Sequence, residues 1–206
     1  MAIRFISKAT VKNKLPRSSN IWDGTAVFNP FTLVGNYDAL ATVTVPSGGV
    51  SSITFAGIPQ TGYSHLQVRI LGRSDGATGN SWAYYTFNND GGTNYSSHYL
   101  QGDGSTASAN AQVGSGSNTE IRANDFPRAD ATTGIFGAAI VDIFDAFSTT
   151  KNKTVRALGG NDRNGSGRIS LYSGAWYSTA AINSIKVTPQ TNNWVQYTQI
   201  ALYGVK

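Results

Sequence analysis

The chain consists mainly of short segments in which apolar and polar residues alternate, separated by turns rich in glycine and asparagine. A period of two places successive side chains on opposite faces of an extended strand. Roughly nine or ten such segments recur at spacings of about 10–18 residues from about residue 39 onward. The longer helical patterns that a parallel α/β sheet needs between its strands are missing. The sequence therefore predicts an all-β, jelly-roll-type β-sandwich over residues 39–206.

The predicted strands cover residues 40–45, 53–55, 65–71, 82–87, 95–100, 120–122, 134–144, 154–158, 168–172, 182–187 and 196–205. A turn over residues 88–92 suggests that segment 95–100 pairs back with segment 82–87. Residues 101–118 are low in complexity and are interpreted as a long surface loop. The most apolar segment, 134–144, is predicted to be a central strand buried on both faces, with a short helix possible at 145–149.

The composition agrees with this architecture. The chain has 23 glycines, one methionine and a single glutamate, Glu120, so residues that favour helices are scarce. It has no cysteine, which excludes disulfides and cysteine-ligated metal sites. No apolar run approaches the length that spans a bilayer, and charges at Lys8 and Lys12 interrupt any signal-peptide core. We expect a protein made and assembled in the cytoplasm of the producing cell, with no membrane partner.

The formal net charge of +5 is concentrated at one end of the chain. Residues 1–17 contain five basic residues and no acidic residue, whereas the other 11 basic residues equal the 11 acidic residues in number. The same segment alternates, which predicts a strand-like arm with Ile3, Phe5 and Val11 on one face and the charged residues Arg4, Lys8 and Lys12 on the other. We interpret residues 1–38 as an extended N-terminal arm and linker.

The arm is predicted to bind a partner protein. Its candidate contact residues are Ile3, Arg4, Phe5, Lys8, Lys12, Lys14, Arg17, Ile21, Trp22 and Phe28. The alternation suits the addition of a strand to the edge of another sheet, steered by the basic charge. A frayed basic tail and a phosphate-binding segment are the alternatives. Nucleic acid is disfavoured because the balanced charge of the remaining chain offers no basic groove.

Two stretches resemble a known family. They are residues 52–69, which contain the sequence SITFAGIP followed by YSHLQVR, and residues 180–205, which begin AAINSIKVTP and end ALYGV. In this order they resemble a group of tailed-bacteriophage virion proteins that is common in marine and cyanobacterial phages. The resemblance covers about residues 39–206, and the arm carries no matching motif. Members are head-decoration or tail-fibre components.

The resemblance implies a non-enzymatic structural protein of the virion. Its partners would be other capsid or tail proteins, it would form a homo-oligomer, with a trimer expected, and it would require no cofactor. The alternative is a receptor- or glycan-binding module at a tail or fibre tip, since exposed aromatic rings can stack on sugars. The candidate glycan-binding residues are Trp82, Tyr84, Tyr95, Tyr99, Trp176 and Tyr177. The same residues suit a core or a subunit interface, which is the favoured interpretation.

The sequence offers weak support for catalysis or metal binding. His65 begins a predicted core strand and is interpreted as structural, and His98 lacks the G-x-S-x-G elbow that would support a Ser–His pair. Glu120 and Asp125 are the carboxylates considered for a polysaccharide-acting enzyme. The turns at 89–91 and 161–165 are rich in oxygen-bearing side chains, but neither matches the spacing of an EF-hand. We interpret their Asn, Asp and Gly residues as residues that favour turns. No catalytic residue and no metal site is predicted.

Overall fold

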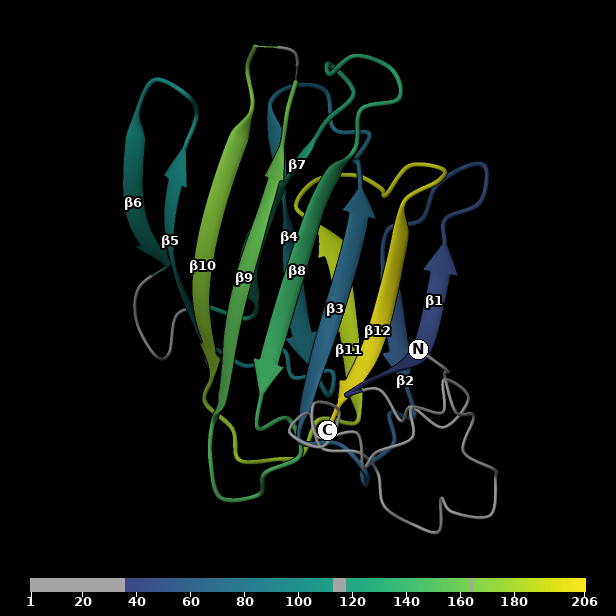
Figure 1. The fold of residues 1–206 in the computed structure, drawn as a ribbon, viewed down its shortest axis with the longest axis vertical. Helices are drawn as coiled ribbons and strands as arrows, with labels where there is room; N and C mark the ends of the chain where they lie inside the picture. Colours follow the sequence, from purple (N-terminus) through teal and green to yellow (C-terminus); the bar gives the residue numbers. More distant parts are fainter. Residues whose placement is uncertain (1–35, 113–117, 164) are drawn as a thin grey trace, which may run out of the picture. The chain divides into compact units, whose positions relative to one another are not determined.

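The computed structural model describes residues 36–112, 118–163 and 165–206, which form two antiparallel β-sheets packed face to face (Figure 1). The larger sheet contains, in spatial order, β1 (Tyr37–Thr44), β12 (Gln199–Val205), β3 (His65–Gly72), β8 (Gly137–Phe144), β9 (Lys153–Asn161), β10 (Arg168–Trp176), β5 (Tyr95–Gly102) and β6 (Ala107–Gln112). The smaller sheet contains β2 (Ile53–Ala56), β11 (Ser184–Pro189), β4 (Asn80–Phe87) and β7 (Ile121–Pro127). Within these ranges no helix is long and apolar enough to cross a membrane.

Eight of the strands form a jelly roll. The order β1-β12-β3-β8 lies in the larger sheet and β2-β11-β4-β7 in the smaller one. Along the chain these strands alternate between the two sheets except at β4 and β7, which pair with each other in the smaller sheet. The other four strands form two hairpins, β5–β6 and β9–β10, which extend the larger sheet beyond β8. The predicted all-β class and jelly-roll sandwich are therefore confirmed. Strand β1 begins two residues before the predicted domain start at residue 39.

The core follows from the alternation along each strand. Val68, Val141 and Val155 point inward from the larger sheet, and Phe55 and Ile185 point inward from the smaller one. All five are buried, and their neighbours along each strand alternate to the outside. Burying a side chain of this kind stabilises the fold by about 1.5–3 kcal/mol. The inward-facing residues thus hold the two sheets together.

An aromatic cluster closes one end of the core. Trp176 of β10 stacks on Tyr95 of β5 with their ring centroids 6.2 Å apart, and it packs against Phe87 of β4 at 5.5 Å. These residues come from both sheets and all are buried. The Tyr95 hydroxyl donates to the Asp90 carbonyl oxygen and lies 3.1 Å from the Phe87 amide nitrogen. The cluster therefore fixes where the chain crosses from β4 to β5.

The predicted pairing of segment 95–100 with segment 82–87 is wrong. β5 pairs with β10 and β6 in the larger sheet, whereas β4 lies in the smaller one. Both edges of β4 are occupied, by β11 and β7, so β4 has no free edge for β5. Residues 88–94 therefore connect the two sheets rather than closing a hairpin.

The predicted loop at residues 101–118 contains a strand. β6 occupies Ala107–Gln112 and forms a hairpin with β5 through a turn in which the Asp103 carboxylate accepts the backbone N–H groups of Ser105 and Thr106. The segment reads Ala-Ser-Ala-Asn-Ala-Gln, which is itself an alternation with a period of two. Its apolar members are only alanines, so hydrophobicity alone did not reveal the strand.

Two expectations for residues 134–149 also fail. β8 begins at Gly137 and alternates between buried and exposed residues, so only one of its faces is covered. Its outward residues include Ala138 and Ile140, whose apolar character had suggested burial on both sides. Residues 145–147 form a turn, and the described parts of the chain contain no helix.

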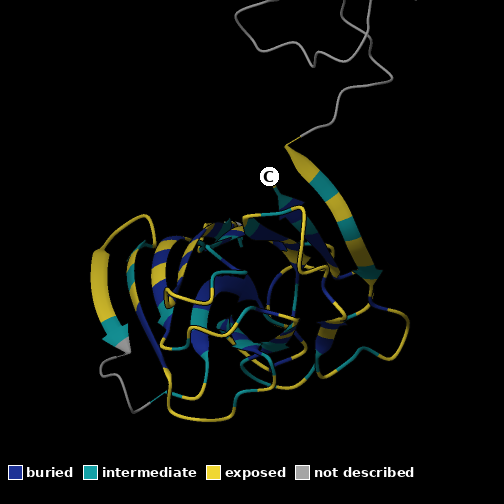
Figure 2. Ribbon diagram, turned by 90° about the horizontal axis from the view of Figure 1, so that it is seen from below, coloured by how far each residue is buried: buried dark blue, intermediate teal, exposed yellow. Residues whose placement is uncertain are grey.

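The larger sheet overhangs the smaller one at both edges. In Figure 2 the strands β1 and β6 lie outside the sandwich and carry no buried residue among those whose burial is described. The smaller sheet has half as many strands, and β7 at its edge packs on β9, β10 and β5. The outer strands of the larger sheet are therefore more exposed than its other strands, although Leu40 and Val43 of β1 still pack partly against the core.

The aromatic cluster provides a test of the core. We expect Trp176→Ala to lower the free energy of unfolding by about 3–5 kcal/mol, because it removes a buried ring and leaves a cavity. Tyr197→Ala, at an exposed aromatic residue, is the control and should change it by less than about 0.5 kcal/mol. Urea unfolding monitored by circular dichroism measures both. Equal, small effects would contradict the placement of Trp176 in the core.

Candidate docking face and the predicted site residues

The outer face of the larger sheet carries two adjacent rows of apolar residues, which we call the aliphatic face. The first row runs across five strands as Ile140, Leu158, Leu171, Leu100 and Ala109. The second runs across six strands as Leu71, Ala138, Gly160, Ile169, Gly102 and Ala107. Cross-strand partners lie side by side on the same face of a sheet, so each row is continuous.

The large side chains of this face are open to solvent. The four leucines and two isoleucines are between 46% and 64% exposed. Leu100, Gly102, Ala107, Leu158, Ile169 and Leu171 also line a shallow hollow in the face. Single exposed leucines are ordinary, whereas a contiguous patch of this kind is a candidate contact surface.

The two faces of β6 differ in polarity, although both are exposed. Ala107 and Ala109 face outward with the aliphatic rows, while Ser108 and Asn110 occupy the opposite face. The polar residues thus lie on the side that continues the interior of the sandwich, where the smaller sheet does not reach. On β6 the outer face is therefore the more apolar of the two.

Polar residues border the aliphatic face. The next row contains Gln67, Asp142, Arg156, Ser173 and His98 in cross-strand register. The Asp142 and Arg156 side chains form an ion pair of 2.8 Å, and Gln67 donates to the Asp142 carboxylate. An apolar centre with a polar rim is the usual anatomy of a protein–protein contact.

Arg69 closes the face on the side of β12. It pairs in register with Ile140, but its guanidinium lies over the rings of Tyr203 and Tyr37, at 4.5 Å and 5.5 Å from their centroids. Its Nε donates to Gln67. The charge is therefore held away from the apolar rows.

Two of the six candidate glycan-binding residues lie in the core. Tyr95 and Trp176 are buried in the aromatic cluster, so neither presents a ring face to a ligand. The Trp176 Nε1–H donates to the Asp90 carboxylate at 2.7 Å, which also orients the turn. For these two residues the sugar-stacking hypothesis is wrong, and the core interpretation holds because hydrophobic burial uses the same ring faces.

Three of the remaining candidates lie around Arg122 of β7, namely Trp82 and Tyr84 from β4 of the smaller sheet and Tyr99 from β5 of the larger one. The Arg122 guanidinium lies over the Trp82 ring, 3.0 Å from its centroid, and also over the Tyr99 ring at 4.7 Å. Tyr84 pairs in register with Arg122, and burial raises the pKa of the Tyr84 hydroxyl. One face of Trp82 is thus already covered by Arg122, and this contact could not be foreseen without the strand register. Tyr177 is exposed elsewhere and its hydroxyl contacts Ser96.

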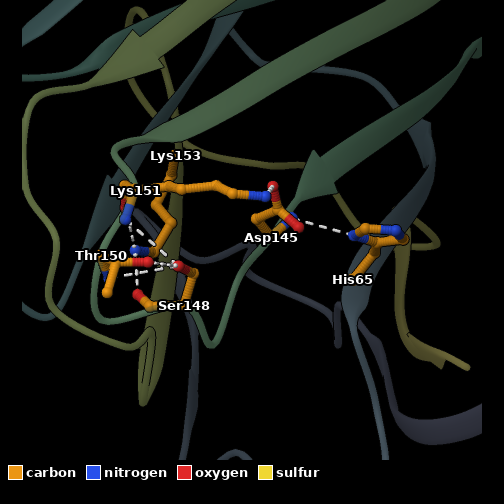
Figure 3. A network of polar contacts seen from close by, with 6 residues as sticks. All are labelled: His65, Asp145, Ser148, Thr150, Lys151 and Lys153. Carbon is orange, nitrogen blue, oxygen red and sulfur yellow. Dashed lines mark hydrogen bonds and ion pairs between the residues drawn. The ribbon is translucent and has the colours of Figure 1, made fainter.

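The histidines have separate surroundings. His65 Nδ1 accepts the backbone N–H of Asp145 at 2.9 Å, and its ring packs edge-on against Phe144 (Figure 3). This contact ties β3 to the end of β8, as expected for a structural histidine. His98 is exposed on β5, in register with Ser173 at the rim of the aliphatic face.

A buried lysine supports the connection between β8 and β9. The Lys153 ammonium donates to the carbonyl oxygens of Ser148 and Lys151, and burial lowers the pKa of this amine. Lys151 forms an ion pair with Asp145, and the hydrogen bond from Lys151 lowers the pKa of the Asp145 carboxyl (Figure 3). Together these contacts hold the turn after β8 in the place where a helix had been considered.

The two candidate catalytic carboxylates have different environments. Asp125 is fully buried beside a β-bulge at Asn124, and its carboxylate accepts hydrogen bonds from the Tyr172 hydroxyl at 2.8 Å and from Arg168 at 3.2 Å. Glu120 precedes β7, is partly exposed, and has its pKa raised by burial. Asp125 thus ties β7 to β10 across the sandwich, and it is not open to a substrate.

The oxygen-rich turns are explained by internal hydrogen bonds. The Asp90 carboxylate accepts from Trp176, Gly92 and Asn94, and the hydrogen bond from Trp176 is the main cause of its lowered pKa. In the second turn Arg163 pairs with Asp130. Among the residues that the structure describes, no group of three His, Asp or Glu side chains is placed to hold a metal ion.

The arm residues, from Ile3 to Phe28, lie outside the described residues. Their predicted role in docking stays a prediction. The aliphatic face was not predicted from the sequence. Its signal is the repeated placement of Leu or Ile at outward positions of β8, β9 and β10, which is visible only once the strand register is known.

Comparison of this chain with protein-family models, with curated proteins and with solved structures found no significant match. Assignment of a function therefore depends on the geometry above and on the two resemblance stretches. These stretches overlap β2–β3 and β11–β12, and β2 pairs with β11 while β3 pairs with β12. The resemblance thus covers adjoining strands of the jelly-roll frame.

The buried carboxylate gives a second prediction. Tyr172→Phe should lower the free energy of unfolding by about 1.5–3 kcal/mol, because it removes a hydrogen bond to a buried charged group. Tyr177→Phe loses a hydroxyl at an exposed site and should cost less than about 0.5 kcal/mol. Urea unfolding at neutral pH compares the two. If Tyr172→Phe were as stable as the wild type, Asp125 would not depend on this donor.

Proposed function

We propose that this chain is a non-enzymatic structural protein of a tailed-phage particle. The jelly roll would be displayed on the capsid or tail as a decoration or fibre component, while the N-terminal arm attaches it to other virion proteins. The observation that carries the proposal is the aliphatic face, because a stable domain with a large uncovered apolar surface is built to be part of an assembly.

The resemblance supports the same function. Its two stretches are separated by 110 residues (70–179) in sequence, yet they supply neighbouring strands in each sheet. A shared frame of this kind fits a virion jelly roll, and the resemblance further suggests a homotrimer. The resemblance is compatible with a location on the head or on the tail of the particle, since no residue of these strands distinguishes the two locations.

The charge distribution supports a separate role for the arm. Residues 1–17 hold the whole basic excess, whereas the aliphatic face is uncharged. Electrostatic attraction steers encounters and depends on salt, while apolar burial supplies contact energy. The arm and the face would therefore serve different contacts.

Glycan recognition has less support. Tyr95 and Trp176 are buried, and Arg122 covers one face of Trp82. Tyr84, Tyr99 and Tyr177 remain at least partly exposed. Tyr177, however, is far from the other two in sequence. It directly follows β10 of the larger sheet, and its backbone N–H donates to the carbonyl oxygen of Asn94 in the connection from β4 to β5. The geometry thus favours a structural role over a sugar-binding one.

Removal of the arm tests the proposed function. Residues 37–206 form a compact unit with their own core, so a protein lacking residues 1–36 should remain folded. We expect it to be missing from purified particles that incorporate the full-length chain, as measured by quantitative mass spectrometry of the particles. Circular dichroism and urea unfolding of the truncated protein provide the folding control. Normal incorporation of the truncated protein would contradict the docking role of the arm.

A further inference from the structure

The aliphatic face needs an occupant, and we propose that it is a second copy of this chain. This inference rests on the proposed structural role, because it names the partner that covers the same surface. The contact would place the aliphatic face of one copy against that of another. Three features of the face support this choice over a different partner.

The first feature is its area. The six large aliphatic side chains expose roughly 500 Å² of apolar surface, near the upper end of the ~300–600 Å² found for the largest patch on a monomer. The adjoining alanines and glycines widen the face further. A standard protein interface needs about 800 Å² from each partner, so the face together with its polar rim is large enough for a specific contact.

The second feature is its charge. None of the eleven residues in the two rows is ionisable. Beside the rows, Asp142 and Arg156 neutralise each other, and Arg69, the in-register neighbour of Ile140, lies over the rings of Tyr203 and Tyr37. A face without charge gives no electrostatic preference for an acidic or a basic partner. It also brings no like charges together when two identical copies meet.

The third feature is the distribution of side-chain sizes. Leu158, Leu171 and Leu100 are large and line a shallow hollow, whereas the same face of β6 carries small residues that include Ala107 and Ala109. Large residues pack best against small ones on the facing surface. The leucines of one copy can therefore pack against the alanines of another, so a single face contains both members of such a pair.

Strand β6 provides a matched pair of variants for the test. Ala109→Lys places a charge on the aliphatic face, and Ser108→Lys places the same charge on the opposite face of the same strand. Both positions are exposed in the single chain, so neither change should unfold it. Leu158→Lys on β9 and Thr54→Lys on the outer face of β2 form a second pair.

Sedimentation velocity of the full-length protein over a range of concentrations measures self-association. We expect the wild type, Ser108→Lys and Thr54→Lys to form the same oligomer. Ala109→Lys and Leu158→Lys should each weaken association by about 10- to 100-fold, since each removes apolar burial and places a charge in the contact. Urea unfolding of every variant confirms that the monomer is intact. A dimer or a trimer with this pattern of variants supports the inference.

Several outcomes would overturn it. These are a wild type that stays monomeric at every concentration, or association that all four variants retain equally. Association lost on deletion of residues 1–36 but kept by Ala109→Lys would assign the contact to the arm. Binding of a monomeric wild type to phosphatidylcholine vesicles would assign the face to lipid.

Particle incorporation separates this inference from the proposed function. A chain that is monomeric in solution but present in purified particles would refute the contact between copies and leave the virion role intact. A chain that self-associates through the aliphatic face but is missing from particles would refute the virion role and leave the contact between copies intact. The two measurements can therefore fail independently.

Discussion

The larger sheet has eight strands and the smaller one has four, and the rest of the structure depends on this mismatch. A four-stranded sheet can cover only part of one face of its partner, so the jelly-roll core is closed while the β5–β6 overhang is not. Asp125, Tyr172 and the cluster around Trp176 secure the last strands that the smaller sheet reaches. Beyond them stability must come from strand pairing and, under the proposed function, from a partner molecule on the outer face.

Strands β9 and β10 carry apolar residues on both of their faces. Inward residues such as Val155 and Tyr172 complete the core, and outward residues such as Leu158 and Leu171 form a second apolar surface. Exposed apolar residues at successive register positions carry a risk of aggregation in an isolated domain. In an assembled particle the same residues would be buried, which is consistent with the proposed structural role.

The jelly-roll frame could be predicted from the sequence because its strands alternate clearly, as in β3 and β11. Strand β6 was not predicted because alanine differs little in hydrophobicity from serine and asparagine. The pairing partner of β5 was predicted wrongly because a sequence does not reveal that both edges of β4 are occupied. Among the site residues, the structural reading of His65 could be anticipated from its strand. The burial of Tyr95 and the cover over Trp82 could not, because aromatic residues serve cores and ligand sites equally well and only three-dimensional packing separates them.

The absence of cysteine from the chain allows a direct test of whether the aliphatic face is covered. Ala109→Cys and Ser108→Cys each introduce a single thiol, on opposite faces of β6. The reaction rate of each thiol with a maleimide, measured on the folded, full-length protein at concentrations where it is assembled, reports the accessibility of that face. The account predicts that the thiol of Ala109→Cys reacts much more slowly than that of Ser108→Cys, and that dilution to monomers removes the difference. Equal rates in the assembled protein would contradict it.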